Sequence, residues 1–150
     1  MSYHPITDVF ILARPKVKFW GAYPSGFLHR ARALLGVGPT DAVLHVCAGM
    51  VRKYPYRGLG PNDKTLDLDP ACEPDFLQDA RDPLPLQIID NSGEPLKAKC
   101  DAVLIDRPYT EEDAAHYVPG SSALPNLNSL LRSALSVVPL GGRAGCLDYL

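Results

Sequence analysis

The sequence predicts one α/β domain built on a trimmed, doubly wound and mostly parallel sheet. Residues 102–105, Ala-Val-Leu-Ile, are continuously apolar, as expected of a strand that is covered on both faces of a parallel sheet. Residues 41–50 and 65–70 predict two more strands, each ending in small or acidic residues. Helical patterns at 27–35 and 126–138 provide the layers that would cover such a sheet.

The composition is that of an ordinary globular domain. Of the 150 residues, 46% are hydrophobic and the formal net charge is −2, so any contact with nucleic acid must come from a local basic patch. The chain shows neither a basic and apolar leader nor an apolar run long enough to cross a membrane. None of the four cysteines belongs to a Cys-x-x-Cys pair, so we expect buried free thiols rather than a metal site. We therefore expect a cytoplasmic protein with one domain, residues 1–150.

Residues 1–22 form an arm of apolar and basic residues, in which Pro5 and Pro15 oppose a helix. We expect the arm to pack on the domain with its basic side chains in solvent, and contact with nucleic acid is the alternative. In the helix predicted at 27–35, Ser25 is the expected N-cap and Gly36 the end. The polar face of this helix, which includes Arg32, is expected in solvent.

The strand at 41–50 ends in a loop of small residues, Cys47-Ala48-Gly49-Met50. Small residues let the backbone approach a ligand closely, and a loop at the carboxyl edge of a parallel sheet is a usual nucleotide site. His45, inside the strand, is either a hydrogen-bonded core residue or a ligand contact.

Residues 51–64 contain two prolines and two glycines, which should reduce the helix after the loop to a turn. The basic side chains of this segment are expected in solvent, and contact with a phosphate backbone is the alternative. These side chains are Arg52, Lys53 and Arg57.

Asp67 lies in the acidic end of the strand at 65–70, eighteen positions after Gly49. In dinucleotide-binding folds, an acid at about this distance accepts hydrogen bonds from ribose hydroxyls. The connection from Leu68 to Asp75 is short for a parallel crossover, so one of the strands that it joins should be very short. Residues 84–99 then carry a hairpin pattern where a crossover helix would be usual.

The strand at 102–105 leads into Asp106-Arg107-Pro108-Tyr109, at the edge where open α/β sheets bind ligands. Asp106 offers acceptor oxygens, Pro108 fixes the turn, and Tyr109 offers a flat ring for stacking. A short helix at 111–117, a helix at 126–138 ended by Gly141-Gly142, and a last strand at 144–150 complete the predicted fold.

Asp106-Arg107-Pro108-Tyr109 resembles the Asp-Pro-Pro-Tyr signature of S-adenosylmethionine-dependent amino-methyltransferases, with arginine in place of one proline. The order of helix, small-residue loop, acid-ended strand and Asp79-Ala80 is similar to that family over residues 20–150. The resemblance implies a Rossmann-like methyltransferase fold with strand order 3-2-1-4-5. It departs from the family at His45, which replaces the usual acid, and in the glycine set, of which Gly49 alone remains.

The resemblance also implies a role for each matching position. Asp106 and the carbonyl that follows it would hold the target amine, Pro108 would shape the loop, and Tyr109 would stack on the base. S-adenosylmethionine would bind to the small-residue loop, with Asp67 on the ribose and Asp79-Ala80 on the adenine. We assign nine residues to the cofactor site: Tyr23, His45, Cys47, Ala48, Gly49, Met50, Asp67, Asp79 and Ala80.

The resulting hypothesis is methyl transfer from S-adenosylmethionine to an exocyclic amino group, with adenine in DNA as the leading acceptor. The alternatives are a methyltransferase for RNA or a small molecule, and a non-catalytic S-adenosylmethionine-binding subunit in which Arg107 marks decay of the signature. Because residues 144–150 would form an apolar edge and several crossover helices are reduced, we also expect a homodimer or a complex with a recognition subunit.

Overall fold

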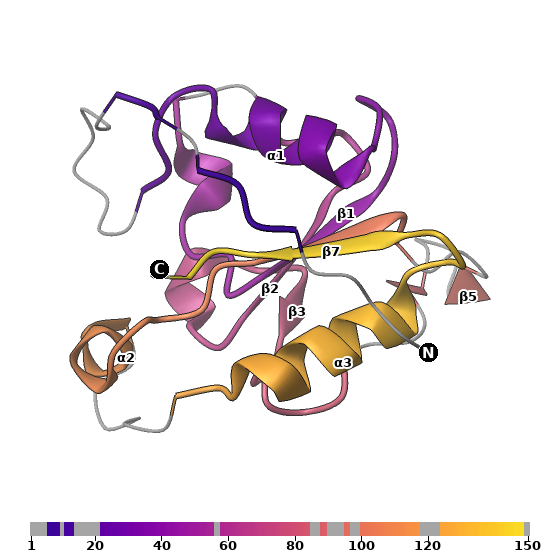
Figure 1. The fold of residues 1–150 in the computed structure, drawn as a ribbon. Helices are drawn as coiled ribbons and strands as arrows, with labels where there is room; N and C mark the ends of the chain where they lie inside the picture. The colour runs from indigo at the N-terminus through magenta and orange to yellow at the C-terminus, as the bar shows by residue number, and fades with distance from the viewer. Residues whose placement is uncertain are drawn as a thin grey trace.

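The computed structural model describes residues 6–9, 11–13, 22–55, 58–84, 88–89, 95–96, 100–117 and 124–148. Within these ranges, five parallel strands form one sheet (Figure 1). They are β1 (Val43–Val46), β2 (Lys64–Asp67), β3 (Phe76–Leu77), β6 (Ala102–Ile105) and β7 (Arg143–Cys146). The order across the sheet is β3-β2-β1-β6-β7, with parallel pairing at every step. In chain order this is 3-2-1-4-5, which confirms the predicted Rossmann-like topology.

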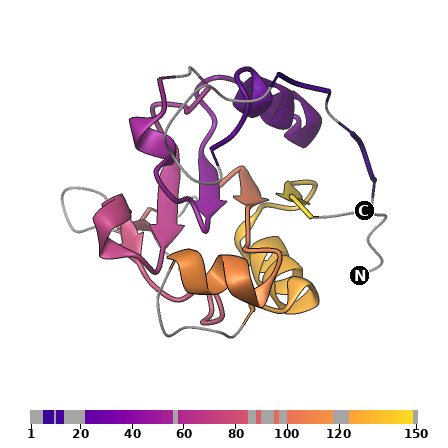
Figure 2. The ribbon, with the colours of Figure 1, turned by 90° about the vertical axis from the view of Figure 1, so that its left-hand side faces the viewer.

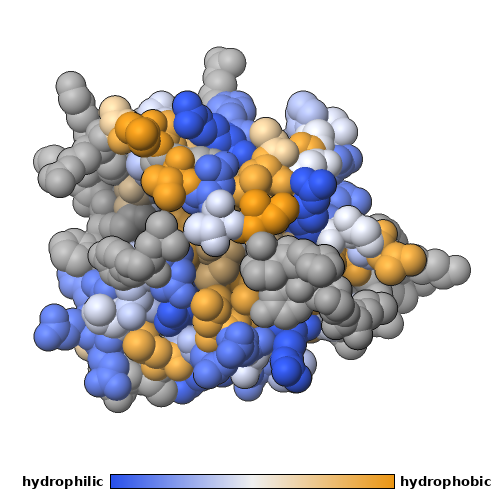
Figure 3. Space-filling view, in the orientation of Figure 1, coloured by the Kyte–Doolittle hydropathy of each residue, from blue (hydrophilic) through white to orange (hydrophobic). Residues whose placement is uncertain are grey.

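Helices lie on both faces of the sheet. Helix α1 (Phe27–Leu35) covers one face and α3 (Leu127–Val137) covers the other, while α2 (Glu111–Tyr117) lies beyond the carboxyl ends of the strands (Figures 1 and 2). In the described part of the chain, no helix is both long and apolar enough to cross a membrane. On the face shown in Figure 3, apolar side chains form several separate patches between hydrophilic ones.

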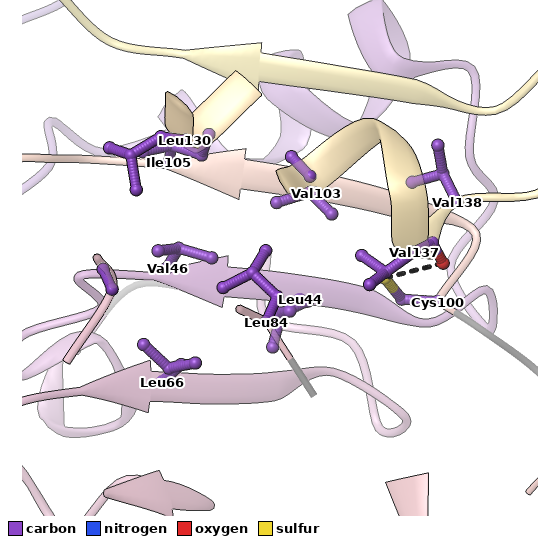
Figure 4. Close-up of a cluster of buried hydrophobic side chains, with 12 residues drawn as sticks. Leu44, Val46, Leu66, Leu84, Cys100, Val103, Ile105, Leu130, Val137 and Val138 are labelled. Carbon is purple, nitrogen blue, oxygen red and sulfur yellow. Dashed lines mark hydrogen bonds between the residues drawn. The ribbon is translucent and has the colours of Figure 1, made fainter. Parts of the chain in front are cut away.

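The core has one half on each side of the sheet, because successive residues of a strand point to opposite faces. All four residues of β1 and all four of β6 are buried, as predicted for central strands. Figure 4 shows the half beneath α3, where Leu130 and Val137 of the helix lie over β1, β2 and β6. On the other side, Phe27, Leu28, Ala31 and Leu35 of α1 pack against Val43, Ala102 and Leu104.

Three predicted helix features are wrong, each for a local reason. Ser25 does not cap α1, because Gly26 takes the N-cap position with a φ of 83°, which glycine adopts without strain. Arg32 is buried rather than solvated, at 8% exposure. Helix α3 ends at Val137, within one residue of the predicted end at Val138, but Gly141-Gly142 does not end it: Pro139 disfavours a helical conformation at Val138, and that residue is extended. Gly36 does end α1, as expected.

The last strand is shorter than predicted. It pairs residue by residue with β6, from Ala102 with Arg143 to Ile105 with Cys146. One further bond, from the amide of Leu147 to the carbonyl of Ile105, ends the pairing. The strand stops there because β6 itself stops, and residues 149–150 of the predicted segment lie outside the described residues.

In its described residues, the connection after β1 contains one 3₁₀ turn, as its prolines and glycines predict, and the short connection after β2 also contains one. These are η1 (Val51–Lys53) and η2 (Pro70–Cys72). The short link through η2 joins β2 to a third strand of only two residues, which confirms the prediction of a very short strand. The predicted hairpin is also present, as the antiparallel pair β4 (Ile88–Ile89) and β5 (Pro95–Leu96). Most of the arm, including residues 14–21, lies outside the described residues.

Candidate functional site

Two adjoining cavities lie at the carboxyl ends of the parallel strands. The first opens between the loop after β1, the end of β2 and the segment after β3, and the second between the segment before α1 and the loop after β6. Both are lined by Asp106, Pro108 and Tyr117, which therefore form the boundary between them. The predicted site and the observed cavities thus meet at the end of the central strand β6.

The small-residue loop lines the first cavity through Cys47, Ala48 and Gly49. Cys47 and Gly49 both have positive φ, 56° and 53°, so the chain makes a strained turn directly after β1. Burial, with smaller effects from Asp67 and Asp106, raises the pKa of the Cys47 thiol well above its usual range. The thiol is therefore protonated and serves as a small apolar wall rather than a nucleophile.

Asp67 ties this loop to β2. One carboxylate oxygen accepts the Gly49 amide at 2.7 Å and the other accepts the Asp69 amide at 2.9 Å. Each oxygen retains capacity for a further hydrogen bond, and the carboxylate lines the first cavity. The arrangement suits a ligand with two neighbouring hydroxyl groups, as the sequence predicts for a ribose.

Asp79 and Ala80 also line the first cavity. The Arg81 side chain hydrogen-bonds to the Asp79 carboxylate and lowers its pKa. The Arg81 amide also donates to an Asp79 oxygen at 2.9 Å, which closes a tight local turn. The side chain is thus held ionised as an acceptor at the cavity wall.

Asp106 has the most perturbed carboxyl group at the boundary. It is only partly exposed, and the Tyr109 hydroxyl donates to its Oδ1 at 3.2 Å. The hydroxyl of Tyr23, which lines the second cavity together with Asp106, also acts on this carboxyl group. Burial raises the pKa of Asp106 to about 6, although both hydroxyls act in the opposite direction. A carboxylate with such a pKa is ionised at neutral pH and poorly solvated, which is typical of functional sites.

Arg107, where the sequence departs from the Asp-Pro-Pro-Tyr signature, points away from Asp106. Its Nη2 lies 3.0 and 3.1 Å from the two carboxylate oxygens of Asp148, after β7. This ion pair, in which one guanidinium nitrogen contacts both carboxylate oxygens, links the loop to the neighbouring strand end. The restraint that a second proline would give to this loop is therefore supplied, in part, by an ion pair.

The structure brings most of the predicted residues together, but not all. Tyr23, which the sequence predicts to contact the cofactor, lines the second cavity rather than the first, beside Tyr109, which the sequence predicts for the acceptor. Neither His45 nor Met50 lines either cavity. The His45 Nε2 lies 3.1 Å from Asp63 Oδ2 in the core. His45 is therefore a hydrogen-bonded core residue, the first of its two predicted roles.

Several lining residues of the first cavity carry no sequence signal. Tyr54, Gln78 and Tyr117 reach it from a turn, a loop and the end of α2, and nothing in their local pattern distinguishes them from ordinary surface residues. Arg52 and Lys53 are exposed, as predicted, and both form surface ion pairs: Arg52 with Asp75, and Lys53 with Glu73 at 3.5 Å. Arg57 lies outside the described residues.

The raised pKa of Asp106 predicts that this residue costs stability. Between pH 4 and about 6 the folded protein binds a proton that the unfolded chain, with an aspartate pKa near 3.9, has released. Stability therefore falls as the pH rises through this window and stays lower above it. Asp106→Asn should raise the free energy of unfolding at pH 8 by roughly 1–3 kcal/mol. Urea denaturation of wild type and variant at pH 4.5 and pH 8 measures this difference in the free energy of unfolding.

The exposed Asp101, at the amino end of β6, provides the matched control as Asp101→Asn. This variant should not gain stability between the two pH values in the way that Asp106→Asn does. If Asp106→Asn is less stable than wild type at pH 8, burial of the wild-type Asp106 carboxylate does not cost stability.

No protein-family model matches the chain, and no curated protein matches it either. The class of protein is therefore defined by the fold and the site together. It is a Rossmann-like α/β domain with two joined cavities at the carboxyl edge of its parallel sheet.

Proposed function

We propose that the protein is an S-adenosylmethionine-dependent methyltransferase that acts on an exocyclic amino group, with adenine in DNA as the leading acceptor. One observation carries the proposal: two cavities with different linings meet at Asp106 and Pro108. The first offers carboxylates and a small-residue loop. The second offers tyrosine rings beside an acceptor carboxylate. Methyl transfer needs such a pair of neighbouring sites, one for the donor and one for the amine.

The first cavity has the features that the adenosine part of S-adenosylmethionine requires. Asp67 would accept the ribose hydroxyls, and Asp79 would accept the adenine amino group. Gly49 has open space where a Cβ would stand, so its backbone can approach a ligand. When bound, S-adenosylmethionine would supply a methyl group activated on a sulfonium, which the amine lone pair takes as neutral thioether departs, and the nitrogen then loses one proton.

In the second cavity the protein's part is to hold and orient the amine. The Asp106 carboxylate would accept a hydrogen bond from the amine N–H. This contact would direct the nitrogen lone pair toward the boundary between the cavities. Tyr109 would present its ring to a planar base. Pro108 lines both cavities and fixes the backbone between these two side chains.

The proposal extends to a partner. Leu77, at 62% exposure, is an apolar side chain on β3, which lies at one edge of the described sheet. Either a second copy of the chain or a recognition subunit would cover this edge. The same partner would add contacts to nucleic acid.

The proposed function is tested with tritium-labelled S-adenosylmethionine and three acceptors: duplex DNA, RNA and a set of small amines. Transfer to adenine in DNA is the expected result, and His29→Ala, on the exposed face of α1, serves as a control that should retain it. Transfer to RNA or to a small amine alone would show that adenine in DNA is not the acceptor, while the protein would still be a methyltransferase. Cofactor binding without transfer to any acceptor would favour the non-catalytic subunit.

A further inference from the structure

The walls of the second cavity combine aromatic and aliphatic side chains with two carboxylates. Leu147, after β7, provides one aliphatic side chain, and the two acidic residues are Asp106 and Asp113. The tyrosines come from the segment before α1, the loop after β6 and the end of α2: Tyr23, Tyr109 and Tyr117. Such walls suit a flat heterocyclic ring, because aromatic side chains pack on its faces and edges.

Both carboxylates accept hydrogen bonds from neutral donors. The Tyr109 hydroxyl donates to Asp106 Oδ1 at 3.2 Å. The amide and the hydroxyl of Thr110 donate to Asp113 Oδ2 at 3.2 and 3.0 Å. Among the described residues, neither carboxylate takes part in a salt bridge. Their negative charges are therefore not compensated by a cation at the cavity.

Arg107 is the one basic residue among the described residues that line this cavity, and its charge is already compensated. Its Nη2 lies 3.1 and 3.0 Å from the two carboxylate oxygens of Asp148, and its Nη1 donates to the Pro108 carbonyl at 3.4 Å. The remaining nitrogen, Nε, is buried. A phosphate in the cavity could therefore pair with this guanidinium only by displacing Asp148.

We propose that the second cavity admits an uncharged heterocyclic base and excludes phosphate. The inference rests on the proposed function, which makes this cavity the acceptor site, and it narrows the class of acceptor. A base turned out of a nucleic acid meets the requirement, because its phosphates stay outside the cavity. A free mononucleotide does not, since its phosphate would lie near two uncompensated carboxylates.

The test is an NMR titration at pH 8 with adenosine and adenosine 5′-monophosphate as probes, in the presence of S-adenosylhomocysteine. The methyl groups of Ala22 and Leu147 report on the second cavity, and those of Ala48 and Ala80 report on the first. Adenosine should shift the Ala22 and Leu147 signals. The monophosphate should bind to the same cavity at least about ten-fold more weakly. This difference should decrease as sodium chloride is added, because salt screens charge repulsion and leaves steric exclusion unchanged.

Asp113→Asn tests the origin of the repulsion, since it removes one charge and keeps an oxygen that can accept the Thr110 hydrogen bonds. It should reduce the difference between the two probes by about three-fold. Glu112→Gln is the matched control, because it removes an exposed charge from the neighbouring position of α2, which lines neither cavity. If Asp113→Asn fails to fold, the salt dependence of wild type decides.

Equal affinities of the two probes for the second cavity would overturn the inference. So would a difference that either added salt or a folded Asp113→Asn protein leaves unchanged, or an adenosine titration that shifts neither Ala22 nor Leu147. Failure of the proposed function has a separate signature: S-adenosylhomocysteine would then not shift Ala48 and Ala80, while the Ala22 and Leu147 signals would still decide the present inference.

Discussion

Replacing Asp63 with alanine is expected to lower the free energy of unfolding by about 3–5 kcal/mol, because it leaves a buried guanidinium without its counter-charge. Asp63 is 3% exposed, and its carboxylate accepts Arg32 Nη1 at 2.8 Å. It also accepts the amides of Val43 and Gly60, at 3.0 and 2.7 Å. These bonds join α1, β1 and the turn before β2, so their loss affects three elements together.

The contribution of Asp63 to stability is expected to depend on pH, because it requires the ionised carboxylate. Burial raises its pKa, but hydrogen bonds from His45, the Gly60 amide and Arg32 outweigh this and lower it to about 2. The group therefore adds stability that is present above pH 4 and is lost as the pH falls toward 2.

Urea denaturation at pH 7 measures the loss, and Asp82→Ala provides a control at an exposed carboxylate, with an expected change within about 0.5 kcal/mol. The predicted loss is a large part of the 5–15 kcal/mol typical of whole domains. An Asp63→Ala protein as stable as the control variant would show that Arg32 finds another partner at no cost.

Replacing Asp106 with alanine should abolish methyl transfer and spare cofactor binding. The carboxylate lies at the boundary of the two cavities, and on the proposed function it faces the amine while the adenosine contacts lie at Asp67 and Asp79. A residue that orients the attacking group is expected to contribute at least about 100-fold to the rate. Single-turnover tritium transfer measures the rate, and calorimetric titration measures the affinity for S-adenosylmethionine.

The control is Glu112→Ala, which removes an exposed carboxylate from the start of α2 and should leave both quantities unchanged. Equal loss of transfer and of cofactor affinity in Asp106→Ala would indicate a structural role.

Asp106→Asn adds information, because it should fold more stably than wild type while losing the ionised acceptor. Lower activity in a more stable variant would be the stability–activity trade-off expected of a functional carboxylate.

The features that the sequence predicts correctly are those determined within a few residues. The continuous apolar run of β6, the glycine at the end of α1 and the proline-interrupted connection after β1 each have a local physical cause. The carboxyl ends of parallel strands meet at one edge, so the strand order also brings Gly49, Asp67 and Asp106 to one cavity.

The features that the sequence does not predict depend on partners far along the chain. Arg32 belongs to the polar pattern of α1, yet Asp63 lies opposite it and allows its burial. The position of Tyr23 at the second cavity depends on its ring contacts with Phe27 and Tyr54. Similarly, the pairing of Arg107 with Asp148 follows from the adjacency of β6 and β7, which no local pattern encodes.

Calorimetric titration of S-adenosylmethionine into the purified protein tests the central claim most directly. Wild type should bind one cofactor per chain, and Asp67→Ala should bind it more weakly by about 1.5–3 kcal/mol, as expected for hydrogen bonds to a charged group. Asp101→Ala, which removes a carboxylate from the opposite end of the sheet, should bind as wild type does. Saturable binding that depends on Asp67 is the predicted result, whereas a folded wild-type protein that binds no S-adenosylmethionine would contradict the account.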